Sequence, residues 1–186
     1  MAPRILDTAE RLVQERGFNA FSYADIAGEL GVTSASLHYH FPGKAELGRA
    51  LIERYSARFG EALEAIAEHE PASDGMLRAY AGLHLDVLRG GRLCLCGMLA
   101  ADYPTLPPAM QEAVRAFFEM NRLWVAGVFE RGRLDGSFRC TEASDELAGA
   151  LVGGLQGAML VTRPSADTSS FEGAAETMIS AFTGQA

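Results

Sequence analysis

Seven side chains that can hydrogen-bond stand close together in the first quarter of the chain. They begin with hydroxyls, continue with aromatic and imidazole rings, and end with an amine: Thr33, Ser34, Ser36, His38, Tyr39, His40 and Lys44. All of these groups donate hydrogen bonds to anionic oxygens, and the hydroxyls and imidazoles also match the polar edges of nucleotide bases. The stretch therefore has the chemistry of a surface for phosphates and bases.

Two short helices across a tight turn are expected to position these side chains. Ser22, with Asp25 three residues later, is typical of a capping box, and Gly31 ends the first helix after about two and a half turns. Thr33 is a good N-cap for a second helix that Gly43 closes. Two short helices joined by a Gly-containing turn predict a helix-turn-helix, whose second helix enters the major groove of DNA.

The rest of the chain also shows helical spacing of apolar residues. The first helix precedes Gly17, and a long amphipathic stretch runs from Lys44 to about His69. Further helices are expected at about 75–89, 93–102, 107–132, 143–162 and 168–183, with only 137–141 ambiguous. We expect an all-α chain of about nine helices. A three-helix DNA-binding domain would occupy 1–47, with its helix-turn-helix at about 21–41, and a ligand-binding and dimerisation domain 48–186.

Composition narrows the class of protein. The 186 residues carry a formal net charge of −8, which argues against a general nucleic-acid coat. The chain has no apolar run of membrane-spanning length and no signal-peptide pattern, so we expect a cytoplasmic protein without a membrane partner. The sequence shows no Ser-His-Asp order, no HExxH and no phosphate loop, so no enzyme is expected. His38 and His40 project in different directions, and neither a metal nor a cofactor is expected.

The N-terminal residues resemble the DNA-binding domain of the TetR family over about 45 residues. The matching positions are Ile5, Leu6, Ala9, Leu12, Gly17, Phe18, Ser22, Ile26, Ala27, Gly31, Val32, Thr33, Leu37, Tyr39, His40, Phe41, Lys44 and Leu47. The resemblance implies a transcriptional repressor that binds palindromic operator DNA as a homodimer and is released by a small-molecule effector. A generic packed helical hairpin is the alternative for this segment.

The helix-turn-helix geometry and the resemblance together give the expected DNA contacts. These are Ser22, Tyr23, Thr33, Ser34, Ala35, Ser36, His38, Tyr39, His40 and Lys44. The family places a phosphate-contacting lysine where Lys44 stands, the only lysine of the chain. The chain departs from the family at His38, where tyrosine is usual, and at Ala35, where glycine is common. No base preference can therefore be carried over from relatives.

The segment 91–108 resembles a subset of TetR-like regulators with a Cys-rich sixth helix, some of which sense electrophiles or oxidants. Cys94 and Cys96 have two interpretations. As unmodified thiols they would be small buried hydrophobes. As sensors they would need a lowered thiol pKa, which a helix N-terminus beside Arg89 and Arg92 would favour. A thiol-based sensing repressor is therefore the alternative function, and a zinc site lacks a fourth ligand.

Two further sets of residues are predicted for the C-terminal domain. An effector pocket would draw on apolar, aromatic and a few polar side chains: Tyr80, His84, Leu88, Cys94, Cys96, Met98, Tyr103, Phe117, Met120, Asn121 and Trp124. A dimer interface would use the apolar stripes of the last two helices: Leu147, Leu151, Leu155, Met159, Met178 and Phe182. For both sets the alternative is an internal core.

Overall fold

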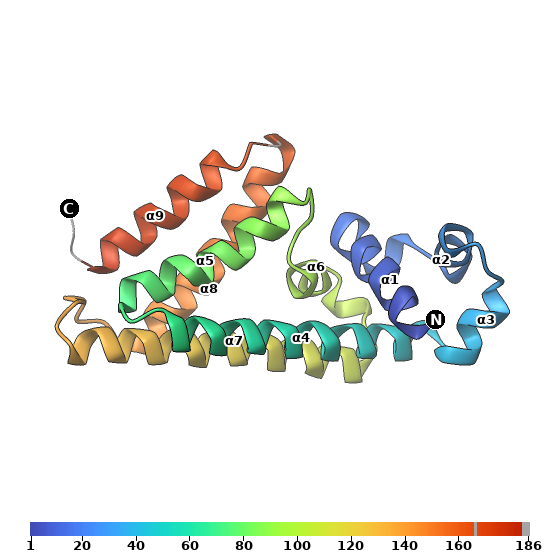
Figure 1. Ribbon diagram of the computed structural model, residues 1–186, viewed down its shortest axis with the longest axis horizontal. Helices are drawn as coiled ribbons and strands as arrows, with labels where there is room; N and C mark the ends of the chain where they lie inside the picture. Colours follow the sequence, from blue (N-terminus) through green and yellow to red (C-terminus); the bar gives the residue numbers. More distant parts are fainter. Residues whose placement is uncertain (166, 184–186) are drawn as a thin grey trace. The chain divides into compact units, whose positions relative to one another are not determined.

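The structure, a computed structural model, describes residues 1–165 and 167–183, which form helices and the turns between them (Figure 1). The elements are α1 (Ala2–Arg16), η1 (Phe18–Ala20), α2 (Tyr23–Leu30), α3 (Ser34–His40), α4 (Lys44–His69), α5 (Ser73–Arg89), α6 (Leu95–Ala101), η2 (Tyr103–Thr105), α7 (Pro108–Leu134), α8 (Ser144–Thr162), η3 (Arg163–Ser165) and α9 (Ser169–Thr183), where η marks a 3-10 helix. The all-α prediction is confirmed, since these described residues contain no strand and 137–141 is irregular.

The turns around α2 form for the reasons that the sequence indicates. The Ser22 hydroxyl accepts the Asp25 backbone N–H (3.4 Å), and the Asp25 carboxylate accepts the Ser22 N–H (2.6 Å), which completes the capping box. Gly31 ends α2 with φ 66°, a left-handed conformation that glycine adopts without strain. The Thr33 hydroxyl then accepts the Ser36 N–H at 3.3 Å and caps α3. Each such cap contributes about 1 kcal/mol.

One compact unit consists of Met1–Arg58 and Cys94–Phe117. Within it α1 packs against α2, α3 and α6. Its core includes fully buried Ile5, Leu12, Ile26, Leu37 and Leu47. Burial of each such side chain contributes about 1.5–3 kcal/mol. Leu37 therefore anchors the short α3, which has only two turns of its own to hold it in place.

Charged side chains also fasten α1 to α4 inside this unit. Glu10 is only 8% exposed, and its carboxylate accepts hydrogen bonds from Arg54 at 2.8 Å and from Arg58 at 2.5 Å. Arg54 also pairs with Asp7 at 2.8 Å. A buried carboxylate is stable only when paired, so these ion pairs hold α1 against α4.

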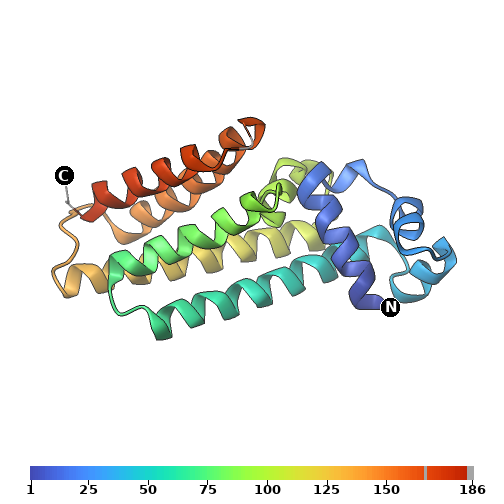
Figure 2. The same ribbon diagram turned by 45° about the horizontal axis from the view of Figure 1, so that its top comes forward.

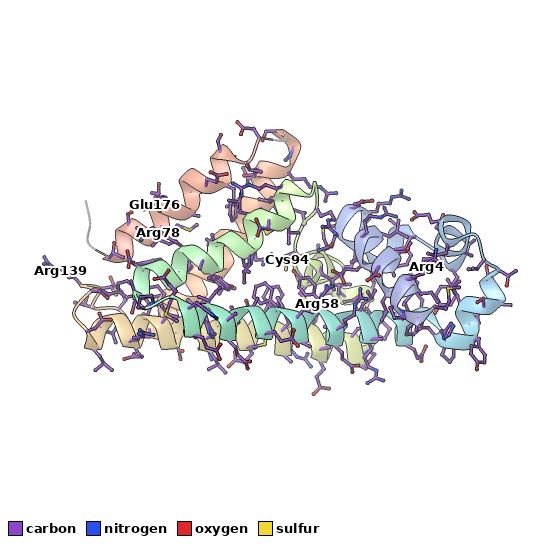
Figure 3. The ribbon with its side chains drawn as sticks, in the orientation of Figure 1. Arg4, Arg58, Arg78, Cys94, Arg139 and Glu176 are labelled. Carbon is purple, nitrogen blue, oxygen red and sulfur yellow. The ribbon has the colours of Figure 1, made fainter. Side chains whose placement is uncertain are left out.

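The second unit consists of Phe59–Leu93 and the chain from Phe118 onward. In it α8 and α9 lie side by side, and α5 packs against both (Figures 1 and 2). Arg78 of α5 donates two 3.0 Å hydrogen bonds to Glu176 of α9, and Figure 3 shows these two side chains next to each other. The apolar core of this unit includes buried Leu151, Leu155 and Phe171.

The two long helices α4 and α7 contribute residues to both units. The domain boundary predicted after residue 47 falls inside the continuous α4. Within the described residues, no helix has both the length and the apolar content needed to span a bilayer.

Candidate nucleic-acid interface and buried polar cluster

The surface of α3 presents most of the residues predicted to contact DNA. Tyr39 is 85% exposed, whereas Leu37 is fully buried. The other members differ in exposure: Thr33, Ala35 and His38 are exposed, and Ser34, Ser36 and His40 are half-buried. Leu37 thus points into the unit, and Ala35 and Tyr39, two residues before and after it, point to the surface.

His38 is held in one orientation by its neighbours. Its Nδ1 lies 3.0 Å from the carbonyl oxygen of Pro42, and its ring lies 4.7 Å from the ring of Tyr23. A carbonyl only accepts, so Nδ1 carries a proton in this contact. Tyr39 and His40 meet edge to face at 5.2 Å.

Tyr23 points its hydroxyl into the unit. The phenol donates to the Phe41 carbonyl at 2.9 Å, and burial, with a smaller effect of Glu46, raises the pKa of Tyr23 to about 12. The donor is therefore used to hold the turn between α3 and α4. Ser22 is engaged in the same way, since its hydroxyl donates to Asp25 at 2.6 Å.

Lys44 lies against the turn that follows α1. Its ammonium donates to the Phe18 carbonyl at 2.5 Å and also to the Phe21 carbonyl. It stands 4.7 Å from the ring centre of Phe18 and 4.2 Å from that of Phe21, which are cation–π distances. Burial lowers the pKa of Lys44, with Asp102 and Asp25 opposing the shift. Two of its three N–H donors are thus satisfied within the chain, which the sequence did not indicate.

Asp102, a residue that the sequence analysis missed, holds the other side of this turn. Its carboxylate accepts the Phe18 N–H at 2.9 Å. Beside it, Asn19 donates to the Thr105 hydroxyl at 2.8 Å, and that hydroxyl donates to the Asp102 carbonyl at 2.7 Å. The η1 turn is therefore held by α4 on one side and by the end of α6 on the other.

In the second unit, four of the predicted pocket residues come together. The Tyr80 hydroxyl donates to the Asn121 amide oxygen at 2.9 Å, and Trp124 stacks on the Tyr80 ring at 5.7 Å. His84 Nδ1 lies 3.2 Å from the Tyr80 carbonyl, and its Nε2 lies 3.2 Å from Gln156 Nε2. We call Tyr80, His84, Asn121 and Gln156 the polar cluster.

Burial fixes the chemistry of the polar cluster. It lowers the pKa of His84 to about 4, against a smaller opposing effect of the Tyr80 carbonyl, so the ring is neutral. Nδ1 must then donate to the Tyr80 carbonyl, and Nε2 accepts from Gln156. Phe59 covers the cluster, with its ring 6.2 Å from that of Tyr80. Phe59 and Gln156 were not predicted, although a long amide among the glycines of α8 was a usable signal.

The other pocket candidates are distributed over both units. Buried Cys94, labelled in Figure 3, accepts from the Tyr55 hydroxyl at 3.6 Å, and Phe117 lies 5.5 Å from the Tyr55 ring. Tyr103 accepts from Arg115 at 2.6 Å. The remaining candidates do not join the polar cluster through a described contact: Leu88 and Cys96 are buried, and Met98 and Met120 are half-buried.

The pKa of Cys96 moves in the direction opposite to that which a sensor needs. Burial, and next the nearby Cys94, raise it well above its usual range. Loss of hydration on burial therefore dominates at this thiol, in place of the lowering that was expected from a helix N-terminus and nearby arginines.

The residues predicted for the dimer interface pack within the chain. Leu147, Leu151, Leu155 and Met159 are at most 6% exposed. Of the α9 residues, Phe182 meets Phe129 edge to face at 5.2 Å, and Met178 fills the space beside Gly154. The opposite side of α8 is open: Gly149 and Gly153 have nothing within 4 Å of a Cβ position, and Leu160 and Val161 are 58% and 80% exposed.

Comparisons with known proteins agree with this architecture. Residues 5–51 match the family of bacterial regulatory proteins described as the tetR family. A TetR-family transcriptional regulator from Agrobacterium tumefaciens is 31% identical, with a TM-score of 0.94 over 98% of this chain and 97% of that one. A TetR transcriptional regulator from Legionella pneumophila is also 31% identical, with a TM-score of 0.88 over 96% and 95% of the two chains.

A curated relative is more distant. The transcriptional regulator AcuR of Cereibacter sphaeroides is 28% identical over 155 residues, which cover 78% of this chain and 68% of that protein. The helix-turn-helix, the helical second unit, and 31% identity to two solved TetR regulators over at least 95% of both chains support one assignment. The chain belongs to the TetR family of transcriptional regulators, DNA-binding proteins that are not enzymes.

Proposed function

We propose that this regulator is a repressor that binds a palindromic operator as a homodimer in the cytoplasm and leaves it when a small molecule binds. The observation that carries the proposal is the face of α3, where hydrogen-bonding side chains are exposed while Leu37 is buried. Residues 1–47 would read the DNA, and residues 48–186 would dimerise and bind the effector.

On the operator, the α3 side chains divide into two groups. Ser34, Ser36 and His38 would meet base edges, and the Ala35 methyl group would contact a thymine methyl. Thr33, Tyr39 and His40 would donate to phosphates. Ser22, Tyr23 and Lys44 would chiefly position the helix-turn-helix, because their side chains donate hydrogen bonds to Asp25, Phe41 and the η1 turn.

The open side of α8 supports the dimer interface better than its leucines do. Gly149 and Gly153, spaced one helical turn apart, would let a helix of the partner approach closely. Exposed Leu160 and Val161 would supply the apolar contact beyond them. Two protomers joined this way would present two recognition helices to successive major grooves, about 34–36 Å apart.

The polar cluster is the proposed effector site. Its groups are neutral and surrounded by the rings of Phe59 and Trp124, which suits an uncharged molecule with an apolar or aromatic body and one hydrogen-bonding group. Such a molecule would replace the Gln156–His84 hydrogen bond. The thiol-sensing alternative gains no support, because buried Cys96 has a raised pKa.

The test is binding of the purified protein to labelled DNA from upstream of its own gene, followed by fluorescence anisotropy at moderate salt. We expect saturable binding to one palindromic segment, at least a hundredfold tighter than to a scrambled duplex of equal length. Transcription in vitro from that promoter should fall when protein is added. Equal affinity for both duplexes, or a rise in transcription, would contradict the repressor proposal.

A further inference from the structure

A cavity of about 540 Å³ lies in the second unit and includes no residue of the polar cluster. Its walls come from the end of α5, the turn after it, and residues Thr162, Arg163 and Thr168. The lining residues that matter here are Leu88, Arg89, Arg92, Thr162, Arg163 and Thr168. The volume is in the range of small-molecule sites.

Three arginines line this cavity in a chain that has 24 acidic and 16 basic residues. Arg89 is directed toward α9 by a 3.2 Å hydrogen bond to Glu172. Arg92 folds over the turn, with its Nη2 3.1 Å from the position that a Cβ of Gly90 would occupy. Glycine at that position therefore leaves room for this guanidinium beside the cavity.

The preference of cations for helix C-termini explains the positions of only two of the three arginines. Arg89 stands in the last turn of α5 and Arg163 at the C-cap of α8, where cations complement exposed carbonyls. Arg92 is outside any helix, and helix ends alone do not call for a cavity. Leu88 gives the walls an apolar part.

We propose that this cavity binds an organic oxyanion, a carboxylate or phosphate carried on a small apolar body. Guanidinium groups bind such heads through paired, charge-assisted hydrogen bonds. The anion would share Arg89 with Glu172, and would take further hydrogen bonds from Arg92 and Arg163. The site does not depend on the repressor role, since its occupancy is measured without DNA.

The experiment is isothermal titration of the full chain with benzoate, phenyl phosphate and neutral benzamide. We expect at least one of the two anions to bind, and a tenfold excess of benzamide, a neutral molecule that suits the polar cluster, to leave that binding unchanged. The anion that binds more tightly identifies the head group. Arg92→Gln and Arg163→Gln should each weaken that binding about tenfold or more, because each removes a charged donor. Arg163→Lys, which keeps the charge but not the planar fork, should weaken it less.

Two matched variants locate the binding. Arg4→Gln removes the same charge from an exposed residue of the first unit, labelled in Figure 3, and should leave anion binding unchanged. Gln156→Ala should also leave it unchanged, because Gln156 belongs to the polar cluster. Circular dichroism checks that each variant folds. The proposal is overturned if neither anion binds, if benzamide displaces the bound anion, if both Arg92→Gln and Arg163→Gln bind as wild type does, or if either control weakens binding as much.

Discussion

The α3 surface and the polar cluster are built in opposite ways. On α3 the bonds that orient side chains are local: Thr33 bonds to Ser36, and His38 to Pro42, three and four residues away. In the polar cluster the bonds join residues 41 and 72 positions apart, Tyr80 to Asn121 and His84 to Gln156. One surface follows from a short stretch of sequence, and the other requires α5, α7 and α8 to pack first.

The same difference predicts which substitutions change DNA binding and which change the stability of the fold. Side chains on the α3 face are exposed, so their replacement should change DNA binding and leave folding intact. Groups of the polar cluster are buried and satisfy one another, so removal of one leaves a buried partner without its hydrogen bond, at a cost of about 1–3 kcal/mol. Substitutions on exposed and buried sides of one element therefore test this contrast directly.

The largest effect is expected on α8. Gly153→Glu places a charge on the open side of the helix, where the structure has room, and should split the dimer and weaken operator binding more than a hundredfold. The protomer should keep its stability, because glutamate is a better helix former than glycine. Sedimentation and anisotropy measure the two quantities.

Leu151→Ala on the buried side is the matched control. It should cost about 2–5 kcal/mol of unfolding free energy, since Leu151 is fully buried. A Gly153→Glu protein that remains dimeric would show that the interface lies elsewhere.

The polar cluster should make stability depend on pH through His84. Its folded pKa of about 4 is below the ordinary 6.5, so the unfolded chain binds a proton at pH values where the folded chain does not. This contribution is fully present above pH 6.5 and decreases as the pH falls toward 4, by roughly 3 kcal/mol. His84→Gln should flatten that part of the urea-unfolding profile. An unchanged difference between pH 7 and pH 5 would mean that His84 is accessible to protons.

Much of the helix-turn-helix could be predicted because its sequence signals are local. The capping box at Ser22, the stop at Gly31 and the cap at Thr33 each involve residues within three positions, and the structure contains all three. The family resemblance and the all-α fold were both predicted from the spacing of residues along the chain, and both are confirmed.

The sequence could not show where long side chains point. Lys44 is 26 residues from Phe18, and Asp102 is 84 residues from it, so neither contact leaves a periodic trace. The leucines of α8 form a genuine apolar stripe, but periodicity does not say whether α9 of the same chain or a second protomer covers it. Here the same chain does, since Leu151 and Leu155 are fully buried within it.

Lys44 allows a sharper test, which separates positioning of the helix-turn-helix from direct phosphate contact. Lys44→Met removes two charge-assisted hydrogen bonds to carbonyls and should lower the unfolding free energy by about 2 kcal/mol. If positioning is its main role, operator affinity should fall while the slope of log K against log salt stays the same. Loss of about one unit of slope would instead show a direct phosphate contact. Thermal melts and a salt series provide both measurements.

The smallest effects come from two tyrosines that lose the same atom. Tyr39→Phe removes a hydroxyl from a side chain that is 85% exposed, so stability should not change and operator affinity should fall about fivefold, the equivalent of one phosphate hydrogen bond. Tyr23→Phe removes a hydroxyl that donates to the Phe41 carbonyl, so it should lower the unfolding free energy by about 1 kcal/mol. Urea unfolding and anisotropy on both variants separate the two outcomes. Loss of stability in Tyr39→Phe, or an affinity loss without destabilisation in Tyr23→Phe, would reverse the roles assigned to these rings.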